Sequence, residues 1–131
     1  PAGLEPLLEL DPLPEVVLSS EMLSRDPEVG RTYDEDPLNY RGPFRRETLR
    51  ALTSGARRVR ERFATLRLPL LVLHGGDDQI VPAAASQDLF DGATSSDKEL
   101  GIYPGLRHEI LNEPEGPGIT DRIADWVLQR C

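Results

Sequence analysis

The sequence predicts an α/β fold in which helices flank a parallel sheet that is incomplete within these 131 residues. The run LPLLVL at residues 68–73 shows no polar alternation, as expected of a parallel strand covered on both faces. A second short strand is predicted at residues 98–103, and a helical pattern follows each strand. This alternation predicts parallel pairing through right-handed crossovers. Two parallel strands leave open edges, so we expect them to be part of a larger sheet.

The composition is that of an ordinary globular protein, with 38% hydrophobic and 29% charged residues. The 15 Lys and Arg against 23 Asp and Glu give a formal charge of −8. This balance argues against a nucleic-acid partner, because nucleic-acid binding relies on basic residues that neutralise phosphates. We interpret the basic cluster of Arg57, Arg58, Arg60 and Arg62 as the solvent face of a helix.

The first 67 residues are predicted to form helices and loops. The density of proline in residues 1–15 predicts an irregular apolar arm. A short helix is predicted near Pro27 to Tyr33, followed by a loop. A longer helix with Pro43 in its first turn is predicted from apolar residues spaced mostly by three and four: Phe44, Leu49, Leu52, Ala56, Val59 and Phe63.

The second half adds two more helices. AAASQDLFDGA predicts a helix closed by Gly92, and one apolar face predicts a C-terminal helix: Ile119, Ile123, Trp126 and Val127. The single cysteine, Cys131, cannot form an internal disulfide. No apolar stretch approaches the length of a membrane span, and no signal-peptide pattern opens the chain. Because the chain begins at Pro1 rather than methionine, we expect further sequence upstream.

Residues that can carry chemistry follow each predicted strand. LLVLHGGDDQIVP contains Asp77 and Asp78, and YPGLRHEILNEP contains His108. The carboxyl ends of parallel strands meet at one edge, where open α/β sheets keep their active sites. A carboxylate beside a histidine fixes the imidazole tautomer and stabilises the imidazolium when the ring takes a proton. We therefore predict an acid–base pair at this edge.

Together these stretches resemble the C-terminal half of monoacylglycerol lipases and lysophospholipase-like serine hydrolases, which have the α/β-hydrolase fold. The resemblance rests on G-x-x-D-x-[IL]-V-P followed by Y-x-G-x-x-H, and on SRDPEVGRTYDEDPL, which is similar to the end of the family's cap. It implies a cap and helical connection at residues 1–67 and the α/β-hydrolase portion at residues 68–131. The family's acid is the third residue after the first glycine of the turn, Gly75, which implies Asp78 as acid and His108 as base.

The same residues allow other interpretations. Asp77 is interpreted as a solvated turn residue, although it is the competing choice for the acid. A competing role for Asp78 is the cap of a helix starting near Pro82. A lone histidine is more often structural than catalytic, and this alternative stays open for His108. The HGG stretch is similar to the oxyanion loop of lipases, but that loop precedes the nucleophile, so His74 is interpreted as a strand-end residue.

The resemblance also implies a nucleophilic serine, which this sequence does not contain in the expected motif. None of the seven serines lies in a G-x-S-x-G elbow: Ser19, Ser20, Ser24, Ser54, Ser86, Ser95 and Ser96. Without a nucleophile and an oxyanion hole, a base has nothing to activate. We therefore interpret the chain as a C-terminal fragment of a serine hydrolase of lipid esters, of monoacylglycerol or lysophospholipid type, that is inactive alone.

The resemblance implies partners and a location as well. The implied partners are a small-molecule lipid ester and the missing N-terminal half of the hydrolase, covalent or in trans. The leucine-rich stretch of residues 4–23 is assigned either to a cap over the acyl pocket or to packing on the main domain. The resemblance implies that the full enzyme can touch a membrane surface through its cap. The implied location is cytoplasmic or membrane-associated.

No organic cofactor or metal is implied, since no His and Cys cluster shows zinc spacing. Two rival functions remain at this point. One is a non-catalytic module that binds a partner through its open sheet edge. The other is a hydrolase of the same fold that acts on another bond, of peptidase or dehalogenase type.

Overall fold

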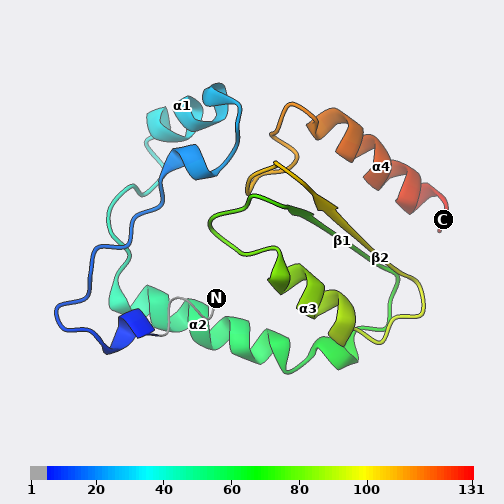
Figure 1. Cartoon of the computed structure of the whole chain (residues 1–131), viewed down its shortest axis with the longest axis horizontal. Helices are drawn as coiled ribbons and strands as arrows, with labels where there is room; N and C mark the ends of the chain where they lie inside the picture. Colours follow the sequence, from blue (N-terminus) through cyan, green and yellow to red (C-terminus); the bar gives the residue numbers. More distant parts are fainter. Residues whose placement is uncertain (1–5) are drawn as a thin grey trace.

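The computed structural model describes residues 6–131 and contains a two-stranded parallel sheet between helices (Figure 1). The strands are β1, Leu70–Gly75, and β2, Lys98–Tyr103. Their register runs from Leu70 opposite Lys98 to Gly75 opposite Tyr103, so the predicted parallel pairing is confirmed. Both carboxyl ends therefore lie at the same edge of the sheet.

The predicted first strand is shifted by two residues. It was expected at residues 68–73 but begins at Leu70, where the backbone N–H donates to the carbonyl of Asp97 at 2.9 Å. Pro69 has no N–H to donate, and Leu68 is 80% exposed. The strand instead extends through His74 and Gly75, which brings both residues into the sheet.

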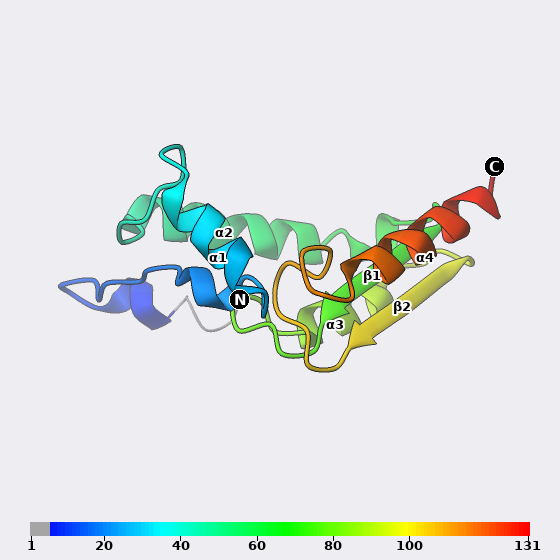
Figure 2. The same ribbon diagram turned by 90° about the horizontal axis from the view of Figure 1, so that it is seen from above.

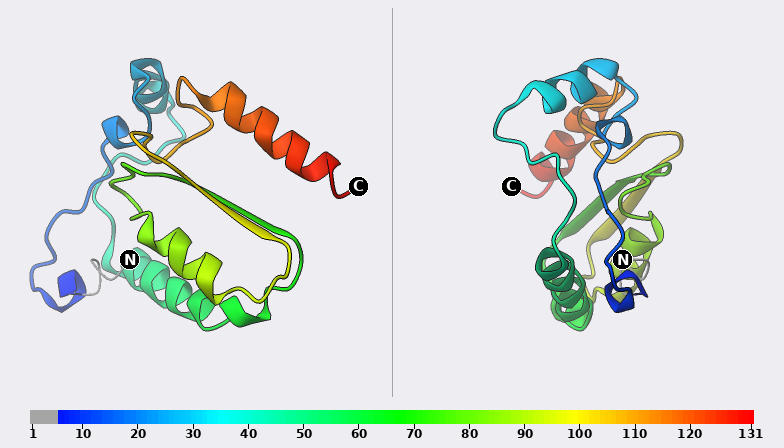
Figure 3. Two further views of the ribbon diagram at one scale, coloured as in Figure 1. Left: turned by 45° about the vertical axis from the view of Figure 1, so that its right-hand side comes forward. Right: turned by 90° about the vertical axis from the view of Figure 1, so that its left-hand side faces the viewer.

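Helices cover both faces of the sheet. Helix α3, Ala84–Gly92, connects the strands and lies on one face, while α4, Gly116–Leu128, lies on the other (Figures 1 and 3). Gly101 of β2 leaves room for the guanidinium of Arg122 on α4, since a Cβ there would lie 2.6 Å from its Nη1. Ile119 of α4 is buried. Both helices lie where the sequence predicted them.

The N-terminal region is made of short helices joined by irregular chain. Three-residue and four-residue 3-10 turns occur at η1, Pro6–Glu9, η2, Ser20–Met22, and η3, Phe63–Thr65. Helix α1, Pro27–Glu35, confirms the predicted short helix. The Asp26 carboxylate caps it by accepting from the Glu28 N–H at 2.9 Å. The first five positions of the predicted apolar arm lie outside the described residues.

Helix α2, Arg46–Arg60, is shorter than predicted. Pro43 and Phe44 precede it rather than forming its first turn, because the backbone at Arg45 is extended, with φ −74° and ψ 150°. The Phe44 N–H donates to the carbonyl of Val16 at 2.8 Å. Leu49 is 1% exposed, whereas other members of the predicted apolar stripe remain uncovered by residues 6–131, with Leu52 at 49% and Val59 at 60% exposed.

The segment before α2 lies beyond the carboxyl ends of the strands (Figure 2). Figures 1 and 3 show η2 and α1 beside the loop that follows β2. This arrangement puts residues 20–35 next to the edge where the acid and the histidine were predicted. None of the helices within residues 6–131 is both long and apolar enough to span a membrane.

Candidate active site

The turn after β1 holds the Asp78 side chain inward. Its Oδ1 accepts hydrogen bonds from the backbone N–H groups of Ile80 at 2.8 Å and Val81 at 2.9 Å. The side chain is only 2% exposed. Helix α3 begins later, with Ala83 at its N-cap, so the alternative role of Asp78 as a helix cap is wrong.

The loop after β2 brings His108 to this carboxylate. Nδ1 of His108 lies 2.8 Å from Oδ2 of Asp78, as predicted for an acid–base pair at this edge. A carboxylate oxygen only accepts, so Nδ1 carries the proton, and in the neutral ring the lone pair is on Nε2. The His108 side chain is 37% exposed. The pair can therefore accept a proton at Nε2 while Asp78 stabilises the resulting imidazolium.

The electrostatics of the pair favour an ionised acid. Burial raises the pKa of Asp78, but the hydrogen bonds from the Val81 N–H, from His108 and from the Ile80 N–H together lower it further. The pKa of Asp78 therefore lies below its ordinary value. At neutral pH the carboxylate is charged and can orient the imidazole.

Two glycines let the two turns meet. A Cβ on Gly75 would collide with the carbonyl oxygens of Leu106 and Arg107, which belong to the histidine loop. A Cβ on Gly76 would lie 3.1 Å from the carbonyl oxygen of Tyr103, to which the Gly76 N–H donates at 2.7 Å. The HGG stretch is thus explained by close backbone approach rather than by an oxyanion loop.

The neighbouring carboxylate, Asp77, lies outside this pair. Its side chain is exposed, while its backbone N–H donates to the carbonyl of Leu106 at 2.9 Å. The expectation of a solvated turn residue is confirmed. The two adjacent carboxylates of the sequence are therefore separated by the turn, one toward solvent and one toward His108.

His74 contributes a contact that sequence reasoning missed. Its Nε2 lies 2.8 Å from the carbonyl oxygen of Val81 and 3.1 Å from Oδ2 of Asp78. Its Nδ1 lies 2.7 Å from Oγ of Ser86. A carbonyl only accepts, so Nε2 carries a proton, and Nδ1 of the neutral ring accepts from the Ser86 hydroxyl. One feature of the sequence could have predicted such contacts: His74 lies at the end of an apolar strand, and the nitrogens of a buried histidine need hydrogen-bond partners.

No group of three or more His, Cys, Asp and Glu side chains within residues 6–131 could hold a metal ion.

Comparison with known proteins identifies related sequences. The family model described as serine aminopeptidase, S33 matches residues 8–115. The monoacylglycerol lipase of Mycolicibacterium smegmatis is 40% identical over 111 residues, which are 85% of this chain and 40% of that protein. The caffeoylshikimate esterase of Arabidopsis thaliana is 33% identical over 80% of this chain and 30% of its own length.

A solved structure shares the arrangement. The crystal structure of Paleococcus ferrophilus monoacylglycerol lipase superposes with a TM-score of 0.80 at 26% identity, covering 99% of this chain and 51% of that one. The chain thus spans 40% or less of the two curated relatives and about half of the solved lipase.

Proposed function

The chain belongs to the serine aminopeptidase S33 family and has part of an α/β-hydrolase lipase fold, and from this premise we propose that it carries the acid and the base of a serine hydrolase. In this proposal Asp78 is the acid and His108 is the base. The nucleophilic serine lies outside these 131 residues, since no serine here occupies a G-x-S-x-G elbow.

The observation that carries the proposal is the 2.8 Å bond between His108 Nδ1 and Asp78 Oδ2 at the carboxyl ends of two parallel strands. In the proposed reaction, Nε2 of His108 takes the proton of the serine hydroxyl as its oxygen attacks the ester carbonyl. The imidazolium then gives that proton to the leaving alcohol. Water, activated by the same nitrogen, releases the acid from the acyl-enzyme.

The proposed substrate class is a lipid ester of monoacylglycerol or lysophospholipid type. Two of the similar proteins are named monoacylglycerol lipases, which supports the lipid acyl group. The esterase from Arabidopsis thaliana supports the ester bond more broadly. We assign residues 1–67 to the cap and its helical connection, and residues 68–131 to the catalytic α/β portion.

The test compares substrates with the full-length protein. We expect hydrolysis of a monoacylglycerol or a lysophospholipid and labelling of one serine by a fluorophosphonate probe. Because the family description names an aminopeptidase, an aminoacyl p-nitroanilide is assayed in parallel. Faster cleavage of the anilide than of any ester would reassign the function to a peptidase.

The 131-residue chain by itself provides the second arm. It should neither hydrolyse a short p-nitrophenyl ester above background nor be labelled by the probe, since it lacks the nucleophile. Labelling of any of its own serines would contradict the assignment. Absence of both activity and labelling in the full-length protein would favour a non-catalytic module.

A further inference from the structure

The loop that carries His108 is tied to a segment more than eighty residues away. The Glu109 N–H donates to the carbonyl of Leu23 at 2.8 Å, and the Ser24 hydroxyl donates to the carbonyl of Asn112 at 2.9 Å. Nη1 of Arg107 donates to the carbonyl of Ser24 at 3.0 Å and to that of Glu21. These bonds join the histidine loop to η2 and to the chain between η2 and α1.

Glu113 lies at the centre of this junction. Its Oε1 accepts from the backbone N–H of Arg107 at 2.6 Å. Its Oε2 accepts from the backbone N–H of Arg25 at 3.1 Å and from Arg25 Nε at 3.0 Å. The side chain has no exposed surface, whereas the Arg25 side chain is 37% exposed. One buried carboxylate thus binds the loop and the distant segment together.

The charge of Glu113 is maintained despite its burial. Burial raises the pKa of Glu113, but the hydrogen bonds from the Arg107 N–H, the Arg25 N–H and the Arg25 guanidinium lower it below its ordinary value. A buried carboxylate is tolerated only when it is paired and hydrogen-bonded in this way. Removing its acceptors would leave the backbone N–H groups of Arg107 and Arg25 without their partner.

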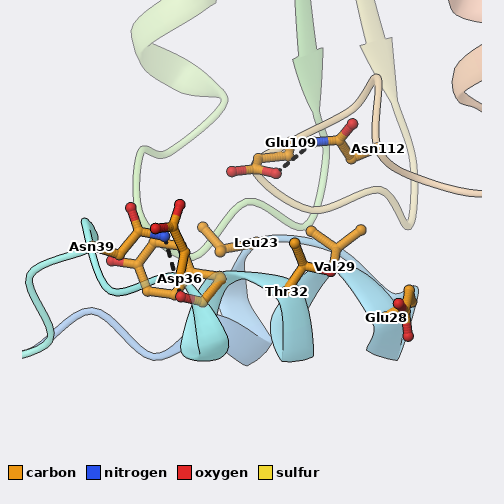
Figure 4. Close-up of a pocket in the computed structure, with 9 residues that line it drawn as sticks. Leu23, Glu28, Val29, Thr32, Asp36, Asn39, Glu109 and Asn112 are labelled. Carbon is orange, nitrogen blue, oxygen red and sulfur yellow. Dashed lines mark hydrogen bonds between the residues drawn. The ribbon is translucent and has the colours of Figure 1, made fainter.

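Helix α1 lies across a hollow from the loop. The hollow has a volume of about 340 Å³ and is lined by residues of both. Figure 4 shows side chains of α1, including Val29 and Thr32, on one side and Glu109 and Asn112 of the loop on the other. Within the described residues, the hydrogen bonds named above hold the loop to Glu21 and to Leu23–Arg25.

His108 is flanked by two of these anchors. The residue before it, Arg107, is held by Glu113, and the residue after it, Glu109, is held by Leu23. Fixing the backbone on both sides limits the positions that the imidazole can reach. The direction of the ring toward Asp78 therefore depends on contacts outside the loop.

We propose that Glu113 is a positioning residue for His108: it fixes the backbone of Arg107 to the Arg25 segment and thereby holds the imidazole at Asp78. This inference deepens the proposed function and rests on it for its kinetic consequences. The structural consequence, the orientation of His108, does not depend on hydrolysis. Both consequences are measurable in the full-length protein.

The test is Glu113→Gln. Glutamine keeps the shape but offers one acceptor oxygen, so either Arg107 or Arg25 loses its bond. We expect kcat to fall roughly 10- to 100-fold, as small misplacements of a catalytic group can cause, with KM changed less than about threefold. By proton NMR, the Nδ1–H signal of His108 should shift or broaden, and Asp78→Asn identifies that signal by abolishing it.

The matched control is Glu35→Gln. Glu35 is also paired with an arginine, since its Oε2 lies 2.7 Å from Nη1 of Arg31, but its side chain is 63% exposed and lies on α1. This variant should leave kcat and the His108 signal unchanged. If Glu35→Gln lowered kcat as much as Glu113→Gln, the proposal would be overturned, because the fall in kcat would then not depend on the position of Glu113.

A second variant covers the case in which Glu113→Gln does not fold. Arg25→Met keeps the alkyl chain and the backbone donor but removes the guanidinium from Glu113. We expect a smaller fall in kcat, about three- to tenfold, with a shift of the His108 signal in the same direction. Unchanged kcat and an unchanged signal in a folded Glu113→Gln protein, or in Arg25→Met, would overturn the positioning role.

The two proposals fail in different ways. If the full-length protein hydrolyses nothing but Glu113→Gln still shifts the His108 signal, the proposed function fails and the positioning role stands. If the protein is an active hydrolase and both variants leave the signal and kcat unchanged, the positioning role fails and the function stands.

Discussion

The acid and the base of the candidate site are held in opposite ways. The Asp78 turn is supported from within, because its carboxylate binds N–H groups only two and three residues ahead. The His108 loop is supported from outside, by residues such as Arg25 that lie 88 positions from Glu113 in the sequence. The bonds of the Asp78 carboxylate to the backbone are local to a short segment, whereas several bonds of the His108 loop join it to a segment more than eighty residues earlier.

This difference predicts different responses to substitution. Changes near Asp78 should alter the chemistry while leaving the turn in place, since the turn needs one oxygen acceptor and two glycines. Changes in the junction around Glu113 should alter the placement of a chemically intact histidine.

The largest effect is expected for Asp78→Asn. The asparagine retains an oxygen for the Ile80 and Val81 N–H groups, so the turn should persist. Its amide cannot stabilise an imidazolium and favours the wrong tautomer of His108, so kcat should fall by a factor on the order of 10⁴. Steady-state kinetics measure the loss, and an unchanged melting temperature shows that the turn persists. A loss below about tenfold would contradict the assignment of Asp78 as the acid.

The contrast also explains what could be predicted from the sequence. The family motif points to Asp78 by its place after Gly75, and the parallel order of two predicted strands places His108 at the same edge. The resemblance and the topology together were therefore sufficient to predict that these two side chains meet. They were also sufficient for the number and order of the elements from β1 onward.

The remaining features depend on tertiary contacts that no local pattern encodes. Glu113 lies in LNEP, which is typical of an exposed loop, and its burial follows from a segment 88 residues earlier. The start of α2 was predicted too early, because the chain is extended at Arg45 while the Phe44 N–H bonds to the carbonyl of Val16. The hydrogen bond between His74 and Ser86 could not be predicted either, because it depends on where α3 places Ser86.

A smaller effect is expected for His74→Leu, which removes the hydrogen bond between Nε2 of His74 and the carbonyl oxygen of Val81 in the Asp78 turn. Leucine leaves the Val81 carbonyl and the Ser86 hydroxyl without their hydrogen bonds. The free energy of unfolding should fall by about 1–3 kcal/mol, the usual cost of unsatisfied buried groups. Denaturant unfolding measures it, with Ser86→Ala as a control that should cost less. An unchanged stability would show that this turn needs no side-chain support.

Acid should weaken the junction of the His108 loop. Because the pKa of Glu113 is lowered in the folded state, its ionised form stabilises the protein above the ordinary glutamate pKa, about 4.5. That stabilisation is lost as the pH falls through the lowered value. The difference in unfolding free energy between the wild type and Glu113→Gln should therefore be largest at neutral pH and shrink toward pH 3. A difference that grows on acidification would contradict the sign of this linkage.

The smallest effect is expected for Asp77→Asn, which makes the same change of charge one residue away from the proposed acid. The Asp77 side chain is exposed, and the contact that this residue makes with Leu106 uses its backbone N–H, which the substitution leaves intact. A charge in solvent acts on the site only through water, so kcat should change by less than roughly tenfold. The same kinetic assay that measures Asp78→Asn provides the comparison, since both variants lose one negative charge at nearly the same place. A general electrostatic effect of the turn would reduce both rates equally, whereas an orienting hydrogen bond would reduce that of Asp78→Asn alone. If Asp77→Asn had the larger effect, the turn in the working enzyme would present the other carboxylate to His108, and the local support of Asp78 by Ile80 and Val81 would not describe the active state.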